Sequence, residues 1–296
     1  MKRKNGFLWI VLTILIPGIA SLAGDGDFRY EQTRSMSKSI SAGPGQTLIV
    51  DRTMADISIS GGKVDQIQAT AEIRVGHDDR KVAETFLKRT SLILEKAGDG
   101  HRLRVDSPLD SIRSRRGLSG FLSRLFNNGE NRISMSVSLT VRVPEKQNLK
   151  IINKFGHIDI DHVNGICRIK NSSGSVILTE CGGELDLENS FDRVTVNTFD
   201  GPVAIRNSSG KVHINTIRGK TRISNSFNEI RFSDIQGELV IQGQSSEVTG
   251  SDLSGNCTIN TSFNPVEVSN VRGWLKIKGQ SCSVTVSYTH LTLPTN

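Results

Sequence analysis

The chain has 296 residues, a formal net charge of +7 and a sequence pI near 9.4, and 36% of its residues are hydrophobic. Two Trp, two Tyr and the lack of a dense Lys/Arg stripe in the sequence exclude the usual pattern of a nucleic-acid-binding protein. The basic excess favours weak affinity for anionic surfaces.

The N-terminus has the pattern of an export signal. Lys2, Arg3 and Lys4 form a positive region, residues 7–16 form an apolar run, and small residues at 21 and 23 precede Gly24. We predict a signal peptide at residues 1–23 and an exported protein of the periplasm or cell surface. An uncleaved anchor is the alternative, because residues 7–23 nearly reach the roughly 20 apolar residues of a membrane-spanning helix.

Residues 24–147 are predicted to be mostly β and less regular than the rest. Alternating segments at 47–51, 56–60, 67–75 and 133–143 are typical of strands, and 91–95 and 101–105 flank a Gly98-Asp99-Gly100 hairpin turn. Residues 79–90 form a helical insertion with Asp78 or Asp79 as its cap. We interpret this region as the irregular N-terminal part of the solenoid predicted below.

A basic amphipathic loop is predicted at residues 108–131, with apolar residues at helical spacing beside several arginines. This composition suits an anionic membrane surface or a groove on a partner. The alternative is a lid whose apolar side covers the protein's own core. The candidate membrane or partner contacts are Arg113, Arg115, Arg116, Leu118, Phe121, Leu122, Arg124, Leu125 and Phe126.

Residues 148–285 divide into 18-residue repeats without insertion, and each full unit ends on Gly, from Gly165 to Gly273. Each unit has two equal halves, and apolar pairs such as Val194/Val196 recur in period-2 spacing. Period-2 alternation predicts strands with one buried face, and strict recurrence predicts that strands of successive units pair in parallel. The fold class is therefore all-β: a parallel β-solenoid, like a β-helix or β-roll, with 18-residue coils and one short helical insertion in the N-terminal part.

Two ladders are predicted in the turns. An Asn occupies one position per coil, where its amide could tolerate left-handed backbone, bond the backbone and stack on its neighbours. Two positions later Phe alternates with Ser, which suits a narrow turn where rings in adjacent coils would collide. The alternation also admits a 36-residue coil; we prefer the 18-residue coil because a longer one would enclose more volume than the aliphatic residues fill. The Asn positions are Asn153, Asn171, Asn189, Asn207 and Asn225, and the Phe positions are Phe155, Phe191, Phe227 and Phe263.

The cysteines and histidines show no metal-ligand spacing. Cys167 and Cys181 are a candidate disulfide, because Cys181 lies four positions before Leu185, which would stack on Cys167. His157 and His162 with Asp159 and Asp161 are expected on a solvated face. We predict no catalytic residue, metal site or cofactor.

The order of these segments resembles a known family. The GQTLIVD and DISISG opening, the helical insertion, the VRVP strand and the GHIDI and VNG repeats over about residues 36–285 resemble the putative-adhesin domain family. That resemblance implies an exported bacterial β-solenoid of unknown function, with adhesion suggested by the family name.

Residues 286–295 resemble a translated sequencing adapter, so residues 286–296 are predicted to be a non-native tail.

Together these patterns predict an exported, non-catalytic binding or structural protein of the cell envelope, adhesin-like. Its partner would be an envelope polymer, a glycan or a protein, with peripheral membrane contact as a further candidate and no nucleic acid. The alternatives are a carbohydrate-active enzyme on the same scaffold, which would need convergent acids, and an envelope-stress or signalling accessory.

Overall fold

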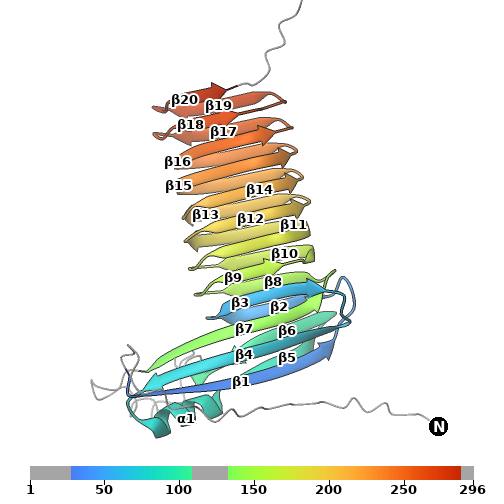
Figure 1. The fold of residues 1–296 in the computed structure, drawn as a ribbon, viewed down its shortest axis with the longest axis vertical. Helices are drawn as coiled ribbons and strands as arrows, with labels where there is room; N and C mark the ends of the chain where they lie inside the picture. The colour runs from blue at the N-terminus through green and yellow to red at the C-terminus, as the bar shows by residue number, and fades with distance from the viewer. Residues whose placement is uncertain (1–27, 109–132, 288–296) are drawn as a thin grey trace, which may run out of the picture.

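A computed structural model describes residues 28–108 and 133–287 of the chain. These residues form a long rod of stacked β-coils, with one helix at the N-terminal end (Figure 1). The strands of the N-terminal part and the helix are β1 (Tyr30–Ser41), β2 (Thr47–Thr53), β3 (Asp56–Gly62), β4 (Gln66–His77), α1 (Arg80–Arg89), β5 (Ser91–Ala97), β6 (Gly100–Asp106) and β7 (Ser134–Pro144). The strands of the repeats are β8 (Asn148–Asn153), β9 (Ile158–Asp161), β10 (Asn164–Asn171), β11 (Val176–Phe191), β12 (Val194–Asp200), β13 (Val203–Ser209), β14 (Val212–Arg218), β15 (Thr221–Gln236), β16 (Leu239–Leu253), β17 (Cys257–Ser262), β18 (Val266–Ser269), β19 (Leu275–Gln280) and β20 (Val284–Ser287).

The register of the parallel strands gives the coil length. In the pairing of β10, Cys167 lies opposite Leu149 on one side and opposite Leu185 on the other, each 18 positions away. The same offset joins β12 to β14 and β17 to β19. The predicted solenoid with its 18-residue coil is therefore confirmed, and the 36-residue coil is wrong.

Each coil has two faces joined at a corner. The first face consists of β8, β10, β13, β17, β19 and the matching parts of β11, β15 and β16, and the second face contains β9, β12, β14, β18, β20 and the remaining parts. The long strands β11, β15 and β16 continue from one face to the other (Figure 1).

The core fills the space between the two faces. Inward positions such as Val194, Val196 and Ile205 are at most 1% exposed, while residues between them face outward. A third inward column, not recognised in the sequence, lies at the corner and recurs once per coil. Its members are Val163, Cys181, Phe199, Ile217, Ile235, Leu253 and Val271. The corner is therefore packed with apolar side chains, and each coil contributes more apolar positions than its two pairs suggest.

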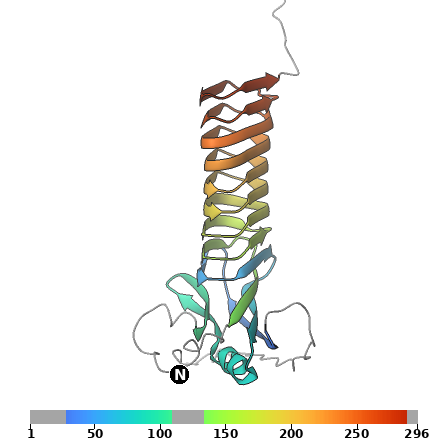
Figure 2. The ribbon, with the colours of Figure 1, turned by 90° about the vertical axis from the view of Figure 1, so that its left-hand side faces the viewer.

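The N-terminal part adds coils in an order that differs from the chain order. β2 pairs with both β6 and β8, and β3 pairs with both β7 and β9, so the coil of β2 and β3 lies between two later segments. β4 joins β1 and β7 by antiparallel pairing, and β5 forms an antiparallel hairpin with β6. Figure 2 shows these two groups of strands diverging at the base of the rod. The predicted hairpin is present, with Ala97 opposite Gly100.

The predicted helix is present as α1. Asp79 is its N-cap and its side chain accepts a hydrogen bond from the Lys81 backbone N–H, which satisfies one donor of the first turn. Ala83, Phe86 and Leu87 are buried, and α1 packs against β1 and β4. The helix therefore covers apolar surface at the N-terminal end of the rod. In the ranges 28–108 and 133–287, no helix is both long and apolar enough to cross a bilayer.

The turn ladders differ in part from the prediction. The five Asn side chains are buried, and several donate to turn carbonyls, as Asn189 does to Phe191 and Asp192 at 2.7 and 3.3 Å. The expectation of left-handed backbone at these positions was wrong: they are absent from the non-Gly residues with positive φ. Other residues of the same turn do adopt it, namely Asp192, Asn228, Phe263 and Ser281. It also recurs once per coil at the opposite turn, at His162, Glu180, Thr198, Thr216, Asp234, Asp252 and Asn270. The chain reverses direction after the second face there, so the left-handed residue is needed at that corner.

Candidate functional site

The predicted contact residues Arg113, Arg115, Arg116, Leu118, Phe121, Leu122, Arg124, Leu125 and Phe126 lie outside the described residues. The membrane or partner contact assigned to them therefore stays a prediction.

Cys167 and Cys181 are both buried and both carry free thiols in the structure. Burial, with a smaller contribution from the neighbouring Cys181, raises the pKa of the Cys167 thiol to about 12. Burial also raises the pKa of Cys181, whose thiol donates to the Thr179 carbonyl at 3.2 Å. As predicted, Leu185 stacks on Cys167; the disulfide itself stays a prediction. As free, protonated thiols, both side chains pack in the core like small apolar residues.

The His162 side chain lies at the left-handed corner, between acids of two successive coils. Its Nδ1 is 2.7 Å from Asp161 and its Nε2 is 2.6 Å from Glu180. The hydrogen bond with Asp161 raises the pKa of the imidazole, and the charge of Glu180 adds to this effect. His157 and Asp159 are exposed, as expected for a solvated face. Within the described residues, no group of three His, Cys, Asp or Glu side chains could hold a metal ion.

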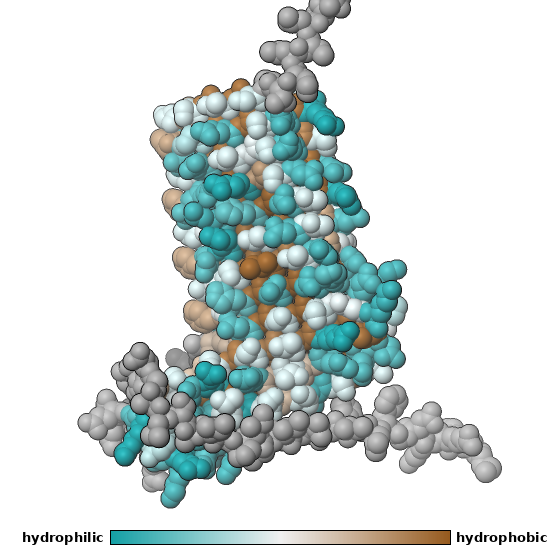
Figure 3. All heavy atoms as spheres, viewed as in Figure 1, coloured by the Kyte–Doolittle hydropathy of each residue, from teal (hydrophilic) through white to brown (hydrophobic). Residues whose placement is uncertain are grey.

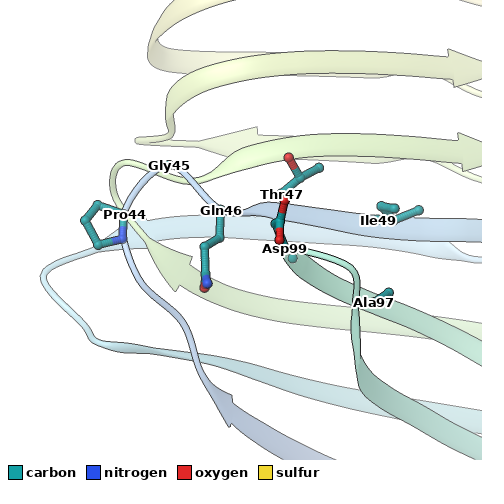
Figure 4. A pocket seen from close by; sticks show the side chains of 8 residues that line it. Pro44, Gly45, Gln46, Thr47, Ile49, Ala97 and Asp99 are labelled. Carbon is teal, nitrogen blue, oxygen red and sulfur yellow. The ribbon is translucent and has the colours of Figure 1, made fainter.

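An open hollow lies beside the N-terminal hairpin. It is lined by the loop at Pro44–Gln46, by Thr47 and Ile49 of β2, and by the β5–β6 turn at Asp99 (Figure 4). Asp99 is the only ionisable side chain in its lining. This hollow does not bring together the acid and base groups that general acid–base chemistry requires.

A basic face covers the first face of the rod. We define the basic face as Lys150, Arg168, Lys170, Arg206, Arg222, Lys276 and Lys278, which are all exposed. They stand in two outward columns that share register along the rod: Lys150 is paired with Arg168, and Glu188 with Arg206. Asp186 and Glu188 are the acids of these columns. Strands of successive coils lie about 4.8 Å apart, so Lys150 and Arg168 are close neighbours, whereas two coils with neutral outward residues separate Arg222 from Lys276.

Two of the basic side chains are neutralised locally. Arg206 contacts Asp186 at 2.6 Å and Glu188 at 3.0 Å, and Lys170 contacts Glu188 at 3.3 Å. The hydrogen bond from Arg206 lowers the pKa of the Glu188 carboxyl. Lys150, Arg168, Arg222, Lys276 and Lys278 form no ion pair with any acid among the described residues. Their charges are therefore available to a ligand.

The second face has a different charge. Two outward columns of this face run through Asp159 and through Asp161. They carry one arginine, Arg231, and three acids, Asp159, Asp161 and Glu267. Ser, Thr and Asn occupy most of the other positions of these two columns. The two faces therefore differ in sign, which composition alone does not reveal.

An aromatic edge separates the two faces at the turn that follows the first face. We define the aromatic edge as Phe155, Phe191, Phe227 and Phe263, which are 55%, 59%, 52% and 67% exposed. The alternating Ser residues lie between them in register: Ser209 is paired with both Phe191 and Phe227. The rings point out of the turn, and apolar atoms project at intervals from one edge of the rod in Figure 3.

Comparison with known proteins gives structural matches only. No family model matches the sequence, and no curated protein matches it. Over 86% of its length, the chain matches a putative adhesin from Bacteroides fragilis (97% of that chain, 11% identity, TM-score 0.33) and a putative cell adhesion protein from Clostridium sporogenes (100%, 9%, 0.26). A putative lipid binding protein from Parabacteroides distasonis matches over the same share (97% of that chain, 13% identity, TM-score 0.32). Every one of these TM-scores is below 0.5, so these matches carry no inference about function.

Proposed function

We propose that the chain is an exported, non-catalytic binding protein of the cell envelope, which holds a linear anionic polymer along its basic face. The observation that carries this proposal is the alignment of seven exposed Lys and Arg side chains along one face of a straight rod.

A repeating scaffold suits a repeating ligand. Each coil presents its outward side chains at the same place as the coil before it, so an extended polymer with phosphates or carboxylates can meet, along one face of the rod, the five cations that form no ion pair within the described residues. Each exposed contact is weak, because water and salt screen the charges. Many such contacts acting on one chain give useful affinity through multivalency. The mechanism is therefore retention by many similar contacts, with no reaction step.

Export supports this role. The signal-peptide pattern at residues 1–23 would deliver the rod to the envelope, where anionic polymers are abundant. For the alternative of a carbohydrate-active enzyme, Asp161 lies near Glu180 and Asp186 near Glu188, and each of these pairs is bonded to an exposed basic side chain. The signalling alternative depends on residues 108–131. Neither alternative has an observation that favours it.

The test measures binding of the purified protein to two soluble polyanions, poly(glycerol phosphate) and polygalacturonate. We expect binding that weakens steeply with added salt, because the contacts are exposed ion pairs. The variant Lys150→Gln/Arg168→Gln/Arg222→Gln should bind about 3- to 100-fold more weakly, since each lost charge removes a contact worth about 0.2–1 kcal/mol.

The matched control is Arg193→Gln/Arg218→Gln/Arg272→Gln, which removes the same number of charges from exposed positions away from the basic face. It should retain most of the affinity. Equal losses in both triple variants would show that net charge alone matters, and no binding by the unaltered protein would reject the proposed function.

A further inference from the structure

We propose that the aromatic edge is a second binding site, which takes an extended β-1,4-linked glycan of gluco-configured sugars by stacking its rings on every second sugar. This inference goes beyond the proposed function, because it concerns an uncharged ligand and a different surface.

The spacing of the rings is the first argument. Phe191 and Phe227 lie two coils apart, because each is paired with Ser209 of the coil between them. At about 4.8 Å per coil the rings recur roughly every 10 Å. In an extended β-1,4-linked glycan, successive sugars are turned over, so the same sugar face recurs once per disaccharide, at the same interval. The four rings would therefore meet equivalent faces of alternate sugars.

The exposure of the rings is the second argument. Each is between 52% and 67% exposed, so more than half of each residue's surface is open to solvent and to a ligand. Burial of an apolar side chain is favourable in free energy, and residues as large and apolar as Phe are usually buried. The electron-rich face of an aromatic ring attracts the polarised C–H groups on the flat face of a pyranose. A ring fixed on a rigid turn makes this contact with little loss of side-chain entropy.

The polarity around the rings is the third argument. The positions directly before and after the Phe/Ser position in the chain form two further columns along the rod. These columns carry two charged residues, Lys154 and Asp192. Ser, Asn, Gln and Gly fill nearly all other positions of these columns, for example Ser172, Ser190 and Ser208. An edge with mostly hydroxyl and amide groups matches a neutral, hydroxyl-rich chain, and Lys154 is the one cation that these two columns offer to a polyanion. The edge is therefore complementary in charge to a neutral glycan, whereas the basic face is complementary to an anionic polymer.

The buried Asn residues fix the backbone of the turns that carry three of the four rings. The amide of Asn189 donates to the carbonyl of Phe191 at 2.7 Å, and that of Asn153 donates to the carbonyl of Phe155 at 3.0 Å. Asn225 makes the same bond to Phe227 at 2.5 Å. The same side chain thus fixes the turn at three of the four rings. Fixed turns in register keep the ring spacing constant, which recognition of a polymer requires.

The experiment uses affinity electrophoresis in gels that contain hydroxyethyl cellulose, a soluble β-1,4-glucan, with dextran as the α-linked control. We expect hydroxyethyl cellulose to retard the protein, dextran to leave its mobility unchanged, and the retardation to persist at about 0.5 M salt, where ionic contacts are screened. Phe155→Ala/Phe191→Ala/Phe227→Ala/Phe263→Ala should abolish the retardation.

The sharpest variant is Phe263→Ser/Ser281→Phe, which keeps the number of exposed rings and moves one ring by a single coil without placing it beside another ring. It should weaken binding by about three- to tenfold, because one of the four rings no longer meets the matching sugar face. It also keeps the proposal testable if the fourfold alanine variant does not fold, which circular dichroism would show.

Three outcomes would overturn the proposal: no retardation of the unaltered protein, equal retardation of the shifted variant, or a dimer that dissociates on loss of the rings. The last result would show that the edge binds a second copy of the chain. Polyanion binding by the basic face is measured separately, and the triple Lys/Arg variant should still bind hydroxyethyl cellulose. Failure of one proposal is thus distinguishable from failure of the other.

Discussion

Gly250 shows that a large side chain in one coil restricts the residue opposite it in the next coil. It lies opposite Phe232 in the parallel pairing of β15 and β16. Phe232 is 1% exposed, and its ring occupies the space that a Cβ at Gly250 would need. The φ angle of Gly250 is not positive, so the requirement for glycine is steric. A large residue in one coil is matched by the smallest residue in the next, which keeps the core filled without overlap.

Gly250→Ala should lower the free energy of unfolding by about 1–3 kcal/mol, the usual effect of overpacking a filled core. Adding Phe232→Leu should restore part of this loss, because the smaller side chain vacates the space beside position 250. Urea unfolding of the single and double variants measures both effects. Gly43→Ala is the control, since its added methyl group would meet only ordinary contacts, at 3.9 Å. An unaltered midpoint for Gly250→Ala would contradict the packing described for these two coils.

The Asn ladder shows how an element repeated along the rod is stabilised. Asn153, Asn171 and Asn189 are at most 3% exposed, and each donates to carbonyl groups of the turn that follows the first face. Direct bonding between amides of adjacent coils occurs at one step, from Asn207 to Asn225 at 3.2 Å. The ladder therefore acts mainly by satisfying the backbone of each turn, since buried carbonyl groups without partners are destabilising.

Asn189→Ala should reduce the free energy of unfolding by about 1–3 kcal/mol, because it leaves turn carbonyls buried without a donor. Asn260→Ala removes an amide from an outward position of β17 and should change stability by no more than about 0.5 kcal/mol. Thermal and urea unfolding compare the two variants. Similar small effects in both would mean that the turn backbone finds other partners, and that the ladder does not stabilise the turns as described.

At the scale of the whole molecule, stability differs along the rod. α1 and the strands around it cover the N-terminal end, whereas β19 and β20 each pair with a single neighbour within residues 28–108 and 133–287. Val284 of β20 is 47% exposed, while its equivalent in the previous coil, Val266, is fully buried. In a solenoid each coil is stabilised by its nearest neighbours, so a coil with one neighbour opens more readily.

Hydrogen–deuterium exchange should therefore show a gradient. Amides of β19 and β20 are expected to exchange first, and those of β12 to β15 last, because the middle coils have a neighbour on both sides. Peptide-level exchange followed by mass spectrometry over minutes to hours gives this profile. Uniform protection along the rod would contradict a nearest-neighbour description and would indicate a single cooperative unit.

The sequence by itself determined the repeated part of the fold. The 18-residue recurrence of apolar pairs and terminal glycines specifies both strand register and coil length, because side chains on a strand alternate and each strand meets its equivalent in the next unit. The alternation of Phe with Ser at one turn position is also visible in the sequence. The helix at Arg80–Arg89 followed from its cap and its apolar spacing.

Only the tertiary structure decided the rest. The strand β1 was missed because Met36 is its one buried residue, so its polar sequence carries almost no alternation. The position of β2 and β3 between segments that follow them in the chain depends on long-range pairing, which no local pattern encodes. The left-handed corner, the opposite charges of the two faces and the exposure of the four rings likewise emerge only when the coils stack, because residues one or two coils apart in the chain become neighbours there.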